Sequence, residues 1–177
     1  MLGAMPPAAS SSERPPDPGA SVGARRLALY LLVFVGAALG LNGWIFSTGA
    51  IAWARTLENP SWSPPGPVIG TVWVLLFALM AGAAYLVDRR GLPARRTPAR
   101  LAIFAQWALC MSWTWAYFGL RNVPNGFYVT VAAWLLCVVA IVLTARASRR
   151  AALLLAPLQG WLSFALALSW VTWQLNR

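Results

Sequence analysis

Five stretches of mostly apolar residues recur along the chain, and each is long enough to cross a lipid bilayer as a helix. They cover residues 27–46, 68–87, 101–120, 127–145 and 151–173, and none carries a charged side chain near its middle. A spanning helix needs about 20 such residues. Because lipid offers no partners to backbone N–H and C=O groups, a helix that satisfies them internally is expected. The pattern predicts an all-α membrane protein, a five-transmembrane-helix bundle.

The segments outside these stretches predict a domain boundary and the loops. Residues 1–24 are rich in Pro, Ala, Ser and Gly and lack an apolar run, so we expect a disordered N-terminal tail before one transmembrane domain at 25–177. Prolines make 48–67 a stiff, irregular loop. Residues 91–99 predict a short basic loop, and Pro157 should kink the last helix or mark its first turns.

The positive charges divide unequally between the two ends of this bundle. One end takes most of the arginines, namely Arg14, Arg25, Arg26, Arg89, Arg90, Arg95, Arg96, Arg100, Arg146, Arg149 and Arg150. The other end takes Arg55, Arg121 and Arg177. Since cytoplasmic loops carry the excess of Arg, we predict a multi-pass protein of the cell membrane with a cytoplasmic N-terminus and an external C-terminus. Loop arginines account for the net charge of +10, so nucleic acid is not an expected partner.

Residues that commonly catalyse reactions or bind metals are scarce. The chain has no His, which removes the usual imidazole base and metal ligand. Its acids, Glu13, Asp17, Glu58 and Asp88, lie in the tail or at span ends. A proton or cation pathway normally keeps an acid inside the bundle. We therefore expect no catalytic site, no metal and no cofactor, although neutral side chains can still bind a neutral or amphipathic ligand.

Tryptophan is the distinctive residue, with eleven in 177 positions. Rings near span ends can anchor a bundle at the lipid headgroups, and these are Trp44, Trp53, Trp62, Trp170 and Trp173. The rings further inside are Trp73, Trp107, Trp113, Trp115, Trp134 and Trp161. Inward rings either fill a core or line a flat cavity for a planar ligand, and the pattern alone leaves both interpretations open.

A series of motifs from the first loop to the chain end resembles a known family. Trp53 and Leu57 precede residues 59–65, which read NPSWSPP, and the next span contains Trp73 and Phe77. The later matches are Gln106, Trp113, Phe118, Gly119, Trp134, Pro157, Trp161, Leu175 and Asn176. This order resembles the tryptophan-rich sensory protein family, also called the TspO or translocator protein (peripheral benzodiazepine receptor) family. The resemblance implies five helices around a pocket that opens toward the first loop.

The chain departs from the family pattern at several positions. Pro67 replaces a Trp, Phe77 and Leu158 replace Tyr, and Cys110 and Ser169 stand at or near family Asn positions. The last four changes remove hydrogen-bonding capacity, so we expect a more apolar cavity. The polar contacts left to it are Gln106, Gln159, Asn42 and Ser169. Each of these could instead form a hydrogen bond between helices.

The resemblance implies a membrane receptor or carrier that binds a hydrophobic planar small molecule, porphyrin-, haem- or sterol-like, with a sensory or transport role. Trp53 and Trp62 would close the mouth of its aromatic-lined cavity. The lining would comprise Trp73, Phe77, Gln106, Cys110, Trp113, Phe118, Trp134, Trp161 and Ser169. Family members often form homodimers, and Gly36 and Gly40 offer this chain such a surface within the lipid.

Two other functions stay open. In the first, the protein is an enzyme that degrades tetrapyrroles with light, and Trp73 and Trp161 would carry radical chemistry. In the second, a bundle without a ligand regulates another membrane protein, and its centre would be packed solid. We favour binding, because no acid, base or metal site supports a reaction in the dark.

Overall fold

The structure is a computed structural model that describes residues 18–177. All regular elements in this part of the chain are helical, and in chain order they are α1 (Pro18–Leu31), η1 (Leu32–Gly36), α2 (Ala37–Ser47), α3 (Ala50–Ala54), α4 (Gly66–Arg90), α5 (Pro93–Thr114), η2 (Trp115–Gly119), α6 (Val123–Ala147), α7 (Arg149–Leu153) and α8 (Ala156–Leu175). The two η elements are π-helical turns. Most of the expected tail lies outside the described residues, and α1 begins before the boundary expected at residue 25.

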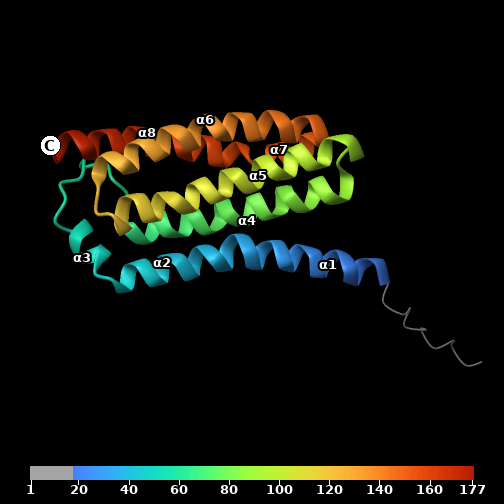
Figure 1. Cartoon of the computed structure of the whole chain (residues 1–177), viewed down its shortest axis with the longest axis horizontal. Helices are drawn as coiled ribbons and strands as arrows, with labels where there is room; N and C mark the ends of the chain where they lie inside the picture. Colours follow the sequence, from blue (N-terminus) through green and yellow to red (C-terminus); the bar gives the residue numbers. More distant parts are fainter. Residues whose placement is uncertain (1–17) are drawn as a thin grey trace, which may run out of the picture.

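The long helices lie side by side along the longest axis of the molecule, as Figure 1 shows. Helix α5 packs along α6, α6 packs against α8, and α4 packs against both α1 and α5. Small residues at these contacts let the backbones approach closely. Buried examples are Ala81, Ala84, Ala102, Ala133 and Ala140.

The first loop is less irregular than its prolines suggest. Helix α3 forms inside it, and the backbone reaches α3 through Gly49, whose φ of 81° is left-handed. The prolines of this loop all follow α3, so none removes a hydrogen bond from that helical turn. The prediction of an irregular segment throughout 48–67 is therefore wrong for its first part, whereas residues 55–65 contain no helix.

Of two further predictions from the prolines and loops, one is wrong and one is confirmed. Gly91 and Leu92 alone join α4 to α5, so the basic loop predicted over 91–99 is wrong. Proline fits the first turn of a helix, where its missing N–H has no partner to lose, and Pro93 starts α5 in this way. The interruption predicted at Pro157 is confirmed, because α7 ends at Leu153 and Pro157 lies in the first turn of α8.

The arginine-rich end of the bundle is fastened by one carboxylate. Tyr30 of α1 donates its hydroxyl to Asp88 of α4, and Arg100 of α5 forms an ion pair with the same Asp88 at 3.4 Å. Three helices therefore meet at Asp88. The ion pair is partly exposed, which limits its own contribution to stability to about 1 kcal/mol or less.

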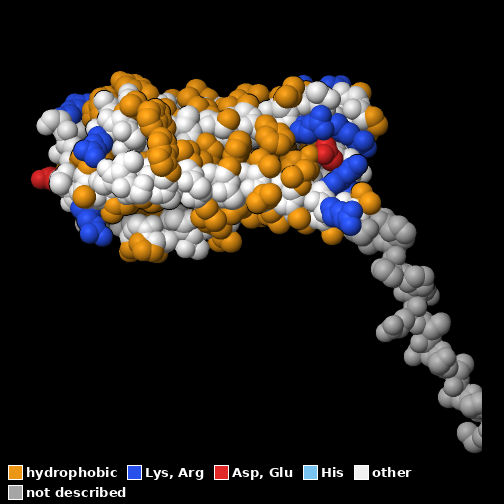
Figure 2. Space-filling view, turned by 60° about the horizontal axis from the view of Figure 1, so that its bottom comes forward, with side chains coloured by type: hydrophobic (Ala, Val, Ile, Leu, Met, Phe, Trp, Pro, Cys, Tyr) orange, Lys and Arg blue, Asp and Glu red, His pale blue; other side chains and the backbone are white. Residues whose placement is uncertain are grey.

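The outer surface of the bundle suits a lipid environment. Figure 2 shows apolar side chains over the middle of the molecule and arginines gathered toward its ends. Four helices are long and apolar enough to span a bilayer, namely Val22–Ser47, Gly66–Arg90, Val123–Ala147 and Arg149–Leu175. The prediction of an all-helical membrane protein is confirmed to that extent. The stretch predicted at 101–120 forms the later part of α5 and η2 and is not among these four helices, so the fifth crossing stays a prediction.

Candidate ligand site beneath the first loop

Four aromatic side chains meet at the end of the bundle that carries the first loop. Trp53 of α3, Trp113 of α5, and Tyr117 and Phe118 of η2 form this group, which we call the mouth cluster. Trp113 stacks on Tyr117 with ring centroids 4.8 Å apart, and Phe118 meets Tyr117 edge-on at 4.9 Å. Trp53 closes the group with an edge contact to Tyr117 at 5.3 Å. Such pairs stabilise beyond their buried area by about 0.5–1.5 kcal/mol each.

The π-helical turn and a glycine make the mouth cluster possible. A π turn shifts the helical register, so the consecutive residues Tyr117 and Phe118 both reach the cluster. Trp113 is fixed by its indole N–H, which donates to the carbonyl of Gly126 at 2.9 Å. A Cβ added to Gly126 would lie 2.4 Å from the Cδ2 atom of Tyr117. The first turn of α6 must therefore lack a side chain at this position.

The first loop is tied to the end of α8 by a single amide. Asn176 accepts the N–H of Glu58 at 3.0 Å and donates to the carbonyl of Glu58 at 2.8 Å. It also donates to the carbonyl of Thr172 at 2.7 Å. The Asn176 side chain thus forms two hydrogen bonds with the backbone of one loop residue, as an adjacent β-strand does. Asn176 therefore positions the loop over the C-terminal end of the bundle.

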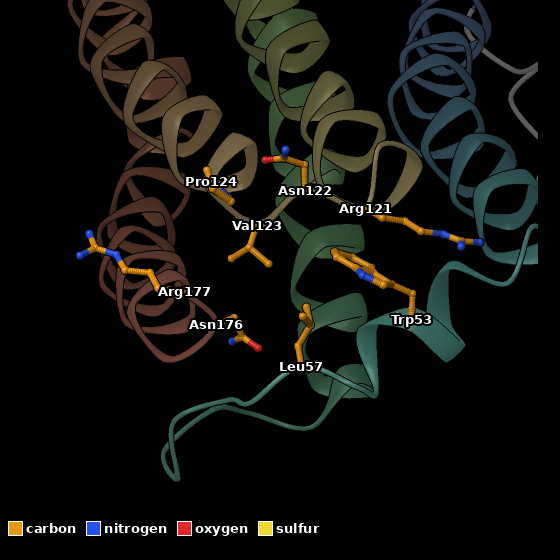
Figure 3. A pocket seen from close by; sticks show the side chains of 8 residues that line it. All are labelled: Trp53, Leu57, Arg121, Asn122, Val123, Pro124, Asn176 and Arg177. Atoms are coloured by element: carbon orange, nitrogen blue, oxygen red, sulfur yellow. The ribbon is translucent and has the colours of Figure 1, made fainter.

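An open hollow of about 470 Å³ lies beside the mouth cluster (Figure 3). Its lining comes from the first loop, the turn before α6, the start of α6 and the residues after α8, namely Trp53, Leu57, Arg121, Asn122, Val123, Pro124, Asn176 and Arg177. Trp53 and Leu57 point into it from the loop side, and Val123 faces them. Of the predicted site residues, Trp53 alone contributes to this lining.

The other predicted site residues form separate groups. Trp73 contacts Phe77 within α4 at 5.4 Å. Trp62 is 48 % exposed and meets Phe164 of α8 at 5.7 Å, and Trp161 contacts the same Phe164 at 5.2 Å. The loop side chain Trp62 therefore rests on α8 beside Trp161.

Four more predicted site residues lie apart from the mouth cluster. Gln106 is fully buried and donates to the Cys110 sulfur at 3.4 Å. Trp134 donates to the Ser163 hydroxyl at 2.9 Å, which couples α6 to α8. Ser169 donates to Ala165 within its own helix. Asn42 likewise donates to Ala38 of its own helix, so neither Ser169 nor Asn42 supplies the hydrogen bond between helices that was considered for it.

Some buried polar atoms have no partner among the described residues. They are Gln106 Oε1, Thr144 Oγ1, Gln159 Nε2 and Oε1, Trp161 Nε1 and Gln174 Nε2. A buried polar atom without a hydrogen bond costs about 1–3 kcal/mol. Gln106 and Gln159 are the polar contacts expected of a more apolar cavity, and Trp161 is a predicted lining residue. None of these three residues belongs to the lining of the hollow.

Sequence reasoning missed Tyr117, Arg121 and Asn122 as site residues. Tyr117 lies between the predicted Trp113 and Phe118, but an ideal helix would not aim Tyr117 and Phe118 at one cluster. Arg121 stood out only as one of the few arginines at its end of the bundle. No group of three or more Cys, Asp or Glu able to hold a metal ion occurs within residues 18–177.

Comparisons with known proteins match this chain to one family. Residues 29–174 match the TspO/MBR family. The chain is 33 % identical to the tryptophan-rich protein TspO of Chlorobaculum tepidum over 152 residues, which cover 85 % of this chain and 96 % of that one. It is 34 % identical to protein CrtK of Rhodobacter capsulatus, covering 85 % and 94 %. It is 30 % identical to the human translocator protein, covering 72 % and 76 %.

Proposed function

The chain belongs to the TspO/MBR family, and on that premise we propose that it is a membrane receptor or carrier for a hydrophobic planar small molecule. The ligand would be tetrapyrrole- or sterol-like, and the role sensory or transporting. The observation that carries the proposal is the mouth cluster, which adjoins the hollow beneath the first loop. Aromatic faces bind flat apolar molecules, and the names of two relatives, tryptophan-rich protein TspO and translocator protein, are consistent with such a role.

Titration with protoporphyrin in nanodiscs tests the proposal. We expect saturable quenching of tryptophan fluorescence. Replacement of Trp53 by Ala should weaken binding about two- to tenfold, because a stacked aromatic pair contributes about 0.5–1.5 kcal/mol. Trp44→Ala is the matched control, because Trp44 lies at the same end but is 57 % exposed and contacts Trp115 on the outside. Quenching that does not saturate, or an equal loss of binding affinity in the Trp53→Ala and Trp44→Ala variants, would contradict the proposal.

We propose binding rather than catalysis as the role of these tryptophans. Light-dependent breakdown of a tetrapyrrole is the alternative, and Trp161, whose indole nitrogen is buried without a partner among the described residues, is its best candidate. Illumination of the loaded protein separates the two. Release of a colourless product that depends on Trp161 would replace the binding proposal, whereas bleaching equal to that of free porphyrin supports it.

We propose five crossings, with α5 and η2 forming the fifth, a cytoplasmic N-terminus and an external C-terminus. The arginines favour this orientation, because within residues 18–177 the Asp88 end of the bundle is far richer in them than the end of the first loop. Alkaline phosphatase fused after Arg177 should be active outside the cell membrane. Four crossings would leave the fusion in the cytoplasm and inactive.

A homodimer through the first helical segment is part of the proposal. A Cβ added at Gly40 would meet no atom within 4 Å, whereas one at Gly36 would lie 3.3 Å from Cδ1 of Leu32, so of the two glycines expected to form this surface Gly40 has room for a second copy of the segment. The mass of the protein in detergent distinguishes a dimer from a monomer.

A further inference from the structure

Two turns of the chain meet at the Asp88 end of the bundle. Helix α4 passes into α5 through Gly91 and Leu92, and α6 passes into α7 through Ser148. The N–H of Leu92 donates to the carbonyl of Ala147 at 3.1 Å, so one turn is fastened to the other. Helix α7 also packs against both α4 and α6. Two segments that are far apart in the sequence therefore form one surface.

This surface is strongly positive. We call six arginines of the two turns and the adjoining helix ends the basic patch, namely Arg90, Arg95, Arg96, Arg146, Arg149 and Arg150. All of them except Arg96 are exposed, and Figure 2 shows arginines gathered at this end of the molecule. No acidic residue occurs within 89–100 or 146–150. The two turns therefore bring positive charges together without supplying a carboxylate to neutralise them.

The contacts of the described residues leave this charge in place. Asp88 is already engaged by Tyr30 and by Arg100, which lies outside the patch, and this is the one ion pair found within residues 18–177. Arg96 donates its Nε–H to the carbonyl of Gly91 at 2.8 Å, a neutral acceptor. Like charges held close together repel one another and oppose the compact state. A bound phosphate would relieve that repulsion, because guanidinium groups pair well with phosphate oxygens.

Exposed leucines accompany the basic patch and indicate what carries the phosphate. Leu92 lies in the turn between α4 and α5 and is 60 % exposed, and Leu153 at the end of α7 is 70 % exposed. A soluble phosphate or a nucleic acid would pair with the arginines but leave both leucines in water, which is unfavourable. A phospholipid presents its phosphate next to acyl chains, so it suits the charged and the apolar side chains together.

We propose that the basic patch binds the phosphate of an anionic phospholipid, such as phosphatidylglycerol, from the leaflet at this end of the bundle. Arginines of both turns would hold the phosphate, and Leu92 and Leu153 would contact the acyl chains. The patch and the hollow beneath the first loop lie at opposite ends of the bundle, so this inference is independent of the ligand proposed there. In the orientation proposed above the leaflet is the cytoplasmic one, whose anionic lipids attract basic segments.

Native mass spectrometry of the full chain in detergent, with added phosphatidylglycerol or phosphatidylcholine, tests the proposal. We expect wild type to bind phosphatidylglycerol at least about tenfold more tightly than phosphatidylcholine. The double variant Arg149→Gln, Arg150→Gln should weaken phosphatidylglycerol binding about tenfold or more, because each arginine near an anionic lipid contributes about fivefold in affinity. Arg90→Gln with Arg95→Gln, from the other turn, should weaken it similarly, since the lipid contacts both turns.

A double variant at the opposite end provides the matched control. Arg55→Gln with Arg177→Gln removes the same charge from exposed positions outside the patch and should leave both affinities unchanged. Unchanged phosphatidylcholine binding shows that the patch variants fold. Equal affinity of wild type for the two lipids, or an equal loss in the control and patch variants, would overturn the inference.

Glycerol 3-phosphate separates a lipid from a soluble phosphate, because it has the phosphate but no acyl chains. It should not displace phosphatidylglycerol from wild type when the two are present at equal concentrations. Displacement that both patch variants abolish would assign the basic patch to soluble phosphates and overturn the inference.

Discussion

Replacing Gly126 with Ala is expected to lower the free energy of unfolding by about 2 kcal/mol, as is typical of an overpacked site. The added Cβ would lie 2.4 Å from Cδ2 of Tyr117, closer than atoms in contact can approach. The Tyr117 ring cannot turn away freely, because it stacks on Trp113 at 4.8 Å and Trp113 is held by the Gly126 carbonyl. The whole mouth cluster must therefore shift.

Thermal unfolding in detergent, followed by tryptophan fluorescence, measures this effect. For a chain of this size we expect the midpoint to fall by about 4–8 °C. Gly160→Ala is the matched control, since a Cβ there meets no atom within 4 Å and alanine favours a helix. Its midpoint should stay the same or rise slightly. Equal midpoints for the two variants would mean that Tyr117 is not locked as the structure has it.

Replacing Asn176 with Ala is expected to release the first loop from α8. The change removes both hydrogen bonds to the backbone of Glu58 and the one to Thr172. Each is worth about 1 kcal/mol net, so the two bonds to the loop imply that exchange of the Glu58 amide hydrogen accelerates at least about tenfold. Porphyrin should also dissociate faster, because the loop carries Trp53 and Leu57 on the wall of the hollow.

Hydrogen exchange with mass spectrometry on peptides that contain Glu58 provides the measurement. Asn59→Ala is the control from the same loop, because the Asn59 amide donates only to the nearby Leu57 carbonyl at 3.1 Å. Asn176→Asp keeps an acceptor for the Glu58 N–H but loses the donors, and should have an intermediate effect. If the Glu58 amide exchanges at the same rate in wild type and Asn176→Ala, Asn176 does not hold the loop.

The apolar runs in the sequence predicted where the helices lie, but not which side of each helix faces the core of the bundle. An apolar run identifies a spanning helix, but lipid and bundle core are equally apolar, so periodicity does not separate a ring that faces lipid from one that faces a neighbour. Trp115 illustrates this: it was grouped with the inner tryptophans but is 47 % exposed. Trp113, two positions earlier, is half-buried in the mouth cluster.

The site depends on contacts that no local pattern encodes. Asn176 and Glu58 are 118 positions apart, and their pairing exists only because α8 ends beside the first loop. The π turn of η2 places Tyr117 and Phe118 together, although helical spacing would separate them. Trp53 and Asn176 belong to the motifs that resembled the family, but that resemblance gave no role to Arg121 or Asn122.

The amino-acid sequence by itself determined that the chain lies in lipid, that it is helical and that arginines are concentrated at one end of the bundle, because hydrophobic length and charge act locally along each segment. Helix packing alone decided which aromatics meet, where the hollow opens and which residues line it, because these depend on residues brought together from α3, η2, the turn before α6 and the end of α8.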